Sequence, residues 1–106
     1  MRTILYLSLI IIATSAYLKG IDVSTWQGKN IDWKKVKSDG VKFAIIRAGY
    51  VGKGGTVRDD TFDINYKNAK SVGIKLGVYW YSNGKSQKEG EKEALACINI
   101  IKGKKI

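Results

Sequence analysis

The sequence of 106 residues contains no histidine and a single cysteine, Cys97. The absence of histidine excludes catalytic triads built on His and zinc sites with His ligands. One cysteine cannot form a disulfide within the chain. Acidic residues are also few, since nine Asp and Glu stand against 19 Lys and Arg and give a net charge of +10. This charge favours an anionic partner, namely nucleic acid, an acidic membrane or an anionic cell-wall polymer, and does not choose among them.

The N-terminal residues have the pattern of a secretion signal. Arg2 precedes the apolar run Ile4–Ala13, and small residues follow as far as Ala16. A charged start, a short apolar run and a small-residue cleavage point are typical of a signal peptide, and the run is too short for an ordinary membrane span. We therefore expect residues 1–16 to be removed and residues 17–106 to be secreted, with no stable membrane insertion after cleavage. An uncleaved anchor is the alternative.

An internal repeat indicates the fold class. The segment "SDGVKFAIIRAGY" begins at Ser38, and the similar "SVGIKLGVYWYSN" begins 33 residues later at Ser71. Each follows a helix-like segment, and each glycine falls where a helix would need a left-handed residue after its last turn. The repeating unit is then a helix, a glycine turn, a buried strand and a loop, which is the alternation of an α/β fold with a parallel sheet.

Extending this pattern outward predicts three βα units with parallel strands. We expect strands at 19–23, 42–48 and 75–81, and helices at 32–39, 60–72 and 86–102. The glycine-rich segment 49–56 is interpreted as a flexible loop, and 103–106 as the start of a fourth strand.

The last predicted helix opens with Ser-x-x-Glu, a capping box. Its apolar residues are spaced as one buried stripe, which makes Cys97 a core residue. The stripe consists of Ala94, Cys97, Ile98 and Ile101. The acidic residues of its first turns, Glu89, Glu91 and Glu93, fit the positive end of a helix dipole better than a catalytic role.

Four motifs in order resemble glycoside hydrolase family 25, the secreted and phage-type muramidases (lysozymes). They are "DVSTWQG" at Asp22–Gly28, the strand Phe43–Gly49, a D-x-x-F-x-x-N pattern at Asp59, Phe62 and Asn65, and "AKSVGIKLGVYWYS". The resemblance runs from Gly20 to about Ile101. It implies a TIM-like (β/α) barrel, which takes about 200–250 residues. We therefore expect a partial barrel, the N-terminal part of a family 25 catalytic domain, with the C-terminal half missing.

The resemblance also implies hydrolysis of the β-1,4 bond between N-acetylmuramic acid and N-acetylglucosamine in bacterial peptidoglycan, without a metal or other cofactor. Such cleavage needs two carboxyl groups. Asp22, at the end of the first strand, is the one catalytic-site residue that the resemblance carries over; on its residues alone it is equally a turn former. The family's Asp-x-Glu on the fourth strand does not occur here, so we expect the 106-residue chain alone to lack lysozyme activity.

Four further residues are candidate substrate contacts. Tyr79 and Tyr81 alternate onto one side of the third strand, and Trp26 follows the first strand. Aromatic rings at a barrel mouth suit the faces of sugars, although aromatic residues in strands are as often core. Arg47, near the end of the second strand, would hold Asp22 or an anionic group of the wall, or form an internal ion pair.

Two other functions are compatible with these residues. A non-catalytic peptidoglycan- or glycan-binding remnant would use the same aromatic faces and the basic surface. A nucleic-acid binder is favoured only by the charge, and the signal-like start argues against it, so we expect no nucleic-acid partner.

Overall fold

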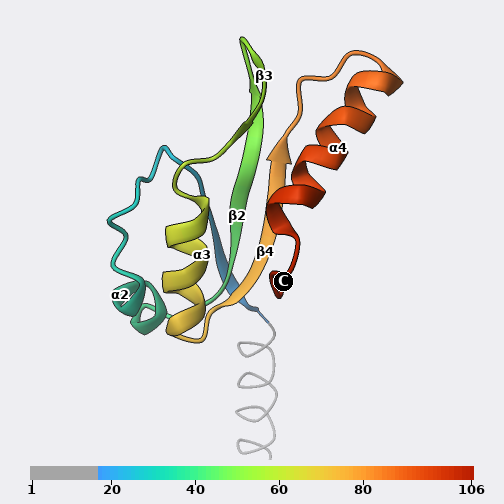
Figure 1. The fold of residues 1–106 in the computed structure, drawn as a ribbon. Coiled ribbons are helices and arrows are strands. Elements are labelled where there is room, and N and C mark those ends of the chain that lie inside the picture. Colours follow the sequence, from blue (N-terminus) through green and yellow to red (C-terminus); the bar gives the residue numbers. More distant parts are fainter. Residues whose placement is uncertain (1–16) are drawn as a thin grey trace, which may run out of the picture.

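Within residues 17–106, which the computed structural model describes, four strands form a single sheet (Figure 1). The strands are β1 (Lys19–Val23), β2 (Val41–Gly52), β3 (Gly55–Arg58) and β4 (Lys75–Tyr81). The helices are α2 (Trp33–Ser38), α3 (Phe62–Ser71) and α4 (Gln87–Ile101). Strand β2 is central and pairs in parallel with both β1 and β4. The predicted α/β fold with three parallel strands is therefore confirmed, and β4 has the predicted bounds.

The two glycines of the repeat end helices as predicted. Gly40 follows α2 with φ 92° and Gly73 follows α3 with φ 82°, a region that glycine enters without steric cost. The helices themselves lie within two residues of their predicted bounds. Asp32 caps α2 by accepting a hydrogen bond from the Lys35 amide, and this favourable end fixes where the helix begins.

The glycine-rich segment 49–56 is a β-hairpin, so its interpretation as a flexible loop was wrong. Strand β2 continues to Gly52, and β3 returns antiparallel beside it, with Tyr50 opposite Val57. Aromatic and β-branched residues on both sides of a short glycine turn favour this pairing. At Gly49 a side chain has no room, because a Cβ atom there would overlap the Val57 carbonyl oxygen and the Trp80 ring. The hairpin therefore extends the central strand beyond its parallel neighbours.

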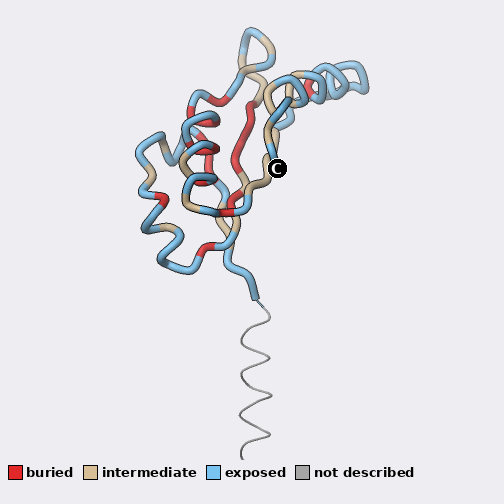
Figure 2. Tube along the Cα trace, turned by 60° about the horizontal axis from the view of Figure 1, so that its bottom comes forward, coloured by how far each residue is buried: buried red, intermediate tan, exposed pale blue. Residues whose placement is uncertain are grey.

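The helices cover one face of the sheet. Alternate residues of β2, namely Ala44, Ile46 and Ala48, are fully buried against them, together with Phe62 of α3 and Trp33 of α2. Figure 2 shows this buried line along β2, flanked by the buried face of α3. The intervening residues of β2 point to the opposite face, over which the described residues place no helix.

Helix α4 corrects the predicted buried stripe. Cys97 and Ile101 are half-buried and pack against the core, but Ala94 and Ile98 are exposed. Compared with the prediction, α4 is rotated about its axis, because the side chain that is buried against β4 is that of Glu93. Burial raises the pKa of the Cys97 thiol, as expected of a packing residue.

The N-terminal end of α4 confirms half of the predicted capping box. The Ser86 hydroxyl accepts from the Glu89 amide, whereas the Glu89 carboxylate accepts from the Lys85 amide rather than from that of Ser86.

The segment 103–106 is not a strand, contrary to prediction. Instead the Tyr66 hydroxyl both donates to the Lys105 carbonyl oxygen, at 3.0 Å, and accepts from the Lys105 amide, at 2.9 Å. The backbone groups that a strand would use are thus satisfied by a side chain. The predicted signal peptide, residues 1–16, lies outside the described residues. Among those described, no helix is long and apolar enough to cross a membrane.

Candidate functional site

A hollow of about 540 Å³ opens at the C-terminal ends of the parallel strands. It is lined by Ser24, Thr25, Trp26, Arg47, Tyr50, Val51, Tyr79 and Tyr81. The structure therefore brings all four predicted substrate contacts to one place, from the loop after β1 and the ends of β2 and β4. Tyr79 is half-buried in the wall, whereas Tyr81 is 59% and Trp26 85% exposed, so two rings are available at the rim.

Asp22 lies on the sheet face away from the helices but does not line the hollow. In the sheet it stands beside Ile45, which in turn stands beside Gly77, and neighbours across strands share a face. Its side chain is exposed. The turn that follows is closed by Gln27, whose side chain accepts from the Ser24 amide, so Asp22 is not the turn former.

Arg47 forms an internal ion pair, one of the alternatives from the sequence. Its Nε donates to Asp59 Oδ2 at 2.8 Å, and the two side chains are 10% and 0% exposed. Asp22 is therefore not the partner of this Nε. The guanidinium also stacks on the Tyr50 ring, 4.5 Å from its centroid. Held on two sides and paired with the Asp59 carboxylate, the Arg47 guanidinium has a fixed position in the wall of the hollow.

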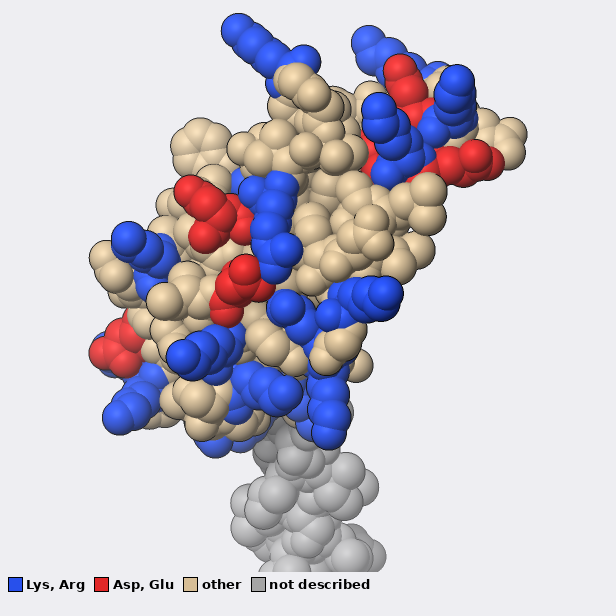
Figure 3. All heavy atoms as spheres, viewed as in Figure 1, with Lys and Arg blue, Asp and Glu red and all other residues tan. Residues whose placement is uncertain are grey.

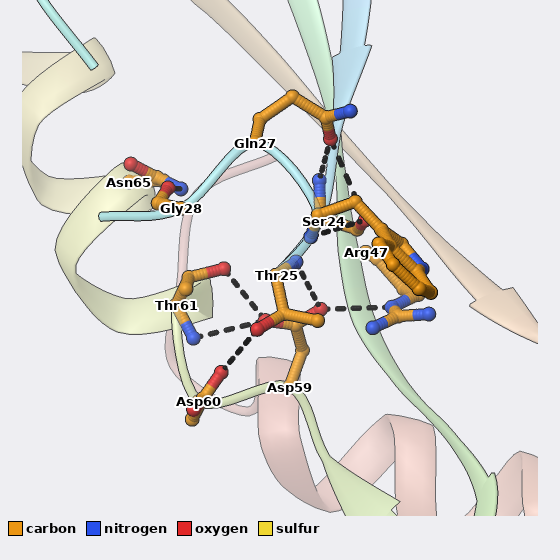
Figure 4. Close-up of polar contacts among 10 residues, drawn as sticks. Ser24, Thr25, Gln27, Gly28, Arg47, Asp59, Asp60, Thr61 and Asn65 are labelled. Carbon is orange, nitrogen blue, oxygen red and sulfur yellow. Dashed lines mark hydrogen bonds and ion pairs between the residues drawn. The ribbon is translucent and has the colours of Figure 1, made fainter. Parts of the chain in front are cut away.

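Asp59 joins three parts of the chain (Figure 4). Besides Arg47 it binds the Thr25 amide at 3.0 Å and, through Oδ1, both the amide and the hydroxyl of Thr61, at 2.9 and 2.6 Å. Burial by itself would raise the pKa of Asp59, but the hydrogen bonds from Thr61, Arg47 and Thr25 outweigh it and lower the pKa. The carboxylate thus stays charged and orders both Arg47 and the loop after β1.

Asn65 fixes the far end of the same loop. Its side-chain amide donates to the Gly28 carbonyl oxygen at 3.0 Å, and its own oxygen accepts from Trp33 Nε1 at 3.3 Å. A third hydrogen bond, from the Thr25 hydroxyl to Asp60 Oδ1 at 2.8 Å, also holds this loop. The D-x-x-F-x-x-N motif therefore anchors the loop that carries Trp26. Sequence reasoning used the motif only for resemblance, although a polar residue on the buried side of a helix was a usable sign.

Glu93 is a second buried carboxylate, and sequence reasoning, which assigned it to the helix dipole together with Glu89 and Glu91, did not predict its burial. It accepts from Trp80 Nε1 at 2.8 Å, and from the Ser82 hydroxyl and the Asn83 amide, both at 3.2 Å. The hydrogen bond from Trp80 is the main cause that lowers the pKa of Glu93. It is also one of the residues around a smaller hollow of about 220 Å³. Because its partners come from β4 and the following loop, Glu93 fastens α4 to the sheet.

The fold and site define an α/β protein with an aromatic hollow at the carboxyl ends of parallel strands. The family model for glycosyl hydrolases family 25 matches residues 21–106, and the chain belongs to this family. The chain is 44% identical to lysozyme M1 of Streptomyces globisporus over 70 residues, 66% of this chain and 22% of that protein. It is 39% identical to the autolytic lysozyme of Clostridium acetobutylicum over 86 residues, 81% of this chain and 24% of that protein.

Solved structures of glycoside hydrolases and autolysins have a similar fold over the part that this chain covers. A family 25 glycosyl hydrolase from Bacillus anthracis matches with a TM-score of 0.65 and 32% identity, over 78% of this chain and 36% of that one. The modular autolysin LytC of Streptococcus pneumoniae, solved with a synthetic peptidoglycan ligand, matches with a TM-score of 0.70 and 35% identity, over 80% and 19%. The chain thus spans about a quarter of the length of the curated relatives it matches.

Proposed function

We propose that the chain forms one wall of the active site of a secreted lysozyme-type glycoside hydrolase that cleaves peptidoglycan. The observation that carries the proposal is the hollow itself, in which Trp26, Tyr79 and Tyr81 gather around a fixed Arg47 at the ends of parallel strands. Aromatic faces pack on the apolar faces of sugar rings, and a guanidinium suits the carboxylates of peptidoglycan. The names of the relatives, two lysozymes and an autolysin, support the same substrate class.

In this proposal the sheet is part of a TIM-like barrel, and Asp22 belongs to its catalytic face. The carboxylate stands on the helix-free side of β1, which in a barrel is the inside. Glycoside cleavage needs a proton donor and a second carboxylate on opposite sides of the bond. Asp22 supplies one carboxylate near the hollow. No Asp or Glu of the described residues lines the hollow itself, so we expect little or no cleavage from these residues alone.

Sugar binding tests the hollow directly. A β-1,4-linked N-acetylglucosamine oligomer, which is uncharged, would be titrated into the full chain while tryptophan fluorescence is followed. Tyr81→Ala is expected to weaken binding about tenfold, since a stacked ring contributes roughly 1 to 2 kcal/mol. Tyr17→Ala removes an exposed ring remote from the hollow and should change nothing. Equal loss in both variants, or no saturable binding, would refute the assignment.

The absence of a carboxylate from the lining also favours a second function, a non-catalytic glycan-binding role. Wall turbidity separates the two. Lysis by the full chain that Asp22→Asn abolishes assigns catalysis to Asp22. Pull-down by insoluble peptidoglycan without lysis, unchanged in Asp22→Asn, assigns binding alone to this chain.

A further inference from the structure

Positive charge is concentrated at the end of the molecule opposite the hollow. In Figure 3 Lys and Arg side chains gather at the lower end, where the strands begin. We call this surface the lysine-rich base and define it by Lys19, Lys42 and Lys75, which lie at the starts of β1, β2 and β4, and by Lys37 and Lys70 in the last turns of α2 and α3. All five are exposed.

Contacts between elements show that these lysines share one end. Lys19 Nζ donates to the carbonyl oxygen of Asp39 after α2, and Lys37 Nζ donates to that of Val72 after α3. Phe43, next to Lys42, stands beside Lys75 in the sheet.

Carboxylates are scarce at the base. Asp39 already pairs with Lys35, at 3.4 Å, and Asp32 caps α2. The other seven lie near the strand ends or in the first turns of helices, nearer the hollow: Asp22, Asp59, Asp60, Asp63, Glu89, Glu91 and Glu93.

Helix dipoles account for only part of the base. Lys37 and Lys70 stand where a helix favours a cation. Strands have only small net dipoles, so Lys19, Lys42 and Lys75 gain nothing comparable. The base also carries two exposed apolar residues, because Tyr17 and Leu18, directly before β1, are 88% and 71% exposed. A soluble polyanion would need the charges alone, whereas a lipid surface uses both the charges and the apolar pair.

We propose that the lysine-rich base, with Tyr17 and Leu18, binds the surface of a membrane containing anionic phospholipids. The lysines face the phosphate headgroups, and the two apolar side chains enter the interfacial layer. Since the strands run from the base to the hollow, a molecule bound in this way holds its hollow away from the lipid. This surface is independent of the function proposed for the hollow.

Vesicle co-sedimentation of the full chain tests the proposal. The base variant carries Lys19→Gln, Lys42→Gln and Lys75→Gln. The matched control carries Lys53→Gln, Lys85→Gln and Lys88→Gln, which remove the same charge from exposed positions at the β2–β3 turn and before or within the first turn of α4. Residues 1–16 are present in both, so any binding by them cancels in the comparison. Thermal melting by circular dichroism establishes that each variant folds.

On phosphatidylcholine vesicles that contain phosphatidylglycerol, the base variant should bind roughly a hundredfold more weakly than wild type, about fivefold for each lysine, and the control within about threefold of wild type. Lys75→Gln alone, about fivefold weaker, serves if the triple variant does not fold. Equal loss in base and control variants, or binding that ignores phosphatidylglycerol, would overturn the proposal. A further result would also overturn the proposal. If the double variant Tyr17→Ser, Leu18→Ser binds vesicles as well as wild type does, and soluble poly(glycerol phosphate) binds the chain as tightly as the vesicles do, then the partner is a soluble polymer.

Discussion

Replacing Asp59 by Asn should destabilise the chain more than any surface substitution, although the two side chains have the same size. Asp59 is 1% exposed and accepts four hydrogen bonds, two through each oxygen. An asparagine that keeps its oxygen toward Thr61 turns its NH₂ group toward two donors, Arg47 Nε and the Thr25 amide. The buried guanidinium of Arg47 then lacks its counter-charge.

Breaking a buried ion pair on one side costs about 3–5 kcal/mol. Domains of this size are stable by about 5–15 kcal/mol, so the loss is a large share of the total. Urea unfolding followed by circular dichroism measures it directly, and the melting temperature should fall by roughly 15 °C or more. Asp60→Asn is the matched control, because this exposed neighbour accepts one bond, from Thr25 Oγ1, and should lose less than about 1 kcal/mol.

Asp59→Asn should also make the free energy of unfolding depend less on pH in the acidic range. The folded state lowers the pKa of Asp59, so its contribution is fully present above the ordinary value of 3.8 and is lost as pH falls through the lower, folded pKa. Wild type should therefore lose stability below about pH 4 more steeply than Asp59→Asn does. If Asp59→Asn unfolds within 1 kcal/mol of wild type, about the error of such measurements, the ion pair does not order the site as argued.

Two further substitutions probe the remaining anchors. Asn65→Ala leaves the Gly28 carbonyl and the Trp33 indole without their partner, and should cost about 2–4 kcal/mol in urea unfolding; an unchanged midpoint would show that the loop does not depend on this side chain. Glu93→Gln should lower stability at neutral pH and shift the emission of Trp80, whose indole loses a charged acceptor, while Glu91→Gln on the exposed side of α4 should do neither.

Elements that bury apolar runs between glycine turns were predictable from the sequence. Strand β4 was predicted residue for residue, and the turns at Gly40 and Gly73 were placed by the internal repeat. The hairpin was not predicted because its glycines also fit a flexible loop. The segment forms strands only through the pairing of β2 with β3, in which Tyr50 lies opposite Val57. Local composition does not contain that pairing.

The sequence predicted that the candidate substrate contacts lie together, but it did not predict the hydrogen bonds that hold them. The aromatic side chains and Arg47 were found because their positions at strand ends follow from the register of a parallel sheet. The partner of Arg47 was not, since Asp59 reaches it from beyond the hairpin through side-chain packing. The sequence also did not predict that Asp22 lies beside the hollow and not in its lining. This depends on the distance between the end of β1, which carries Asp22, and the loop after it, which lines the hollow.

The convergence of three strands at Gly49 bears on how this chain can be labelled. A fluorophore, cross-linker or affinity handle attached there would have to displace both the β3 backbone and the Trp80 ring. Gly54, only five positions on, faces open space without a left-handed backbone and accepts such an attachment. The tip of the hairpin is thus a suitable point at which to attach a probe or a tether close to the hollow.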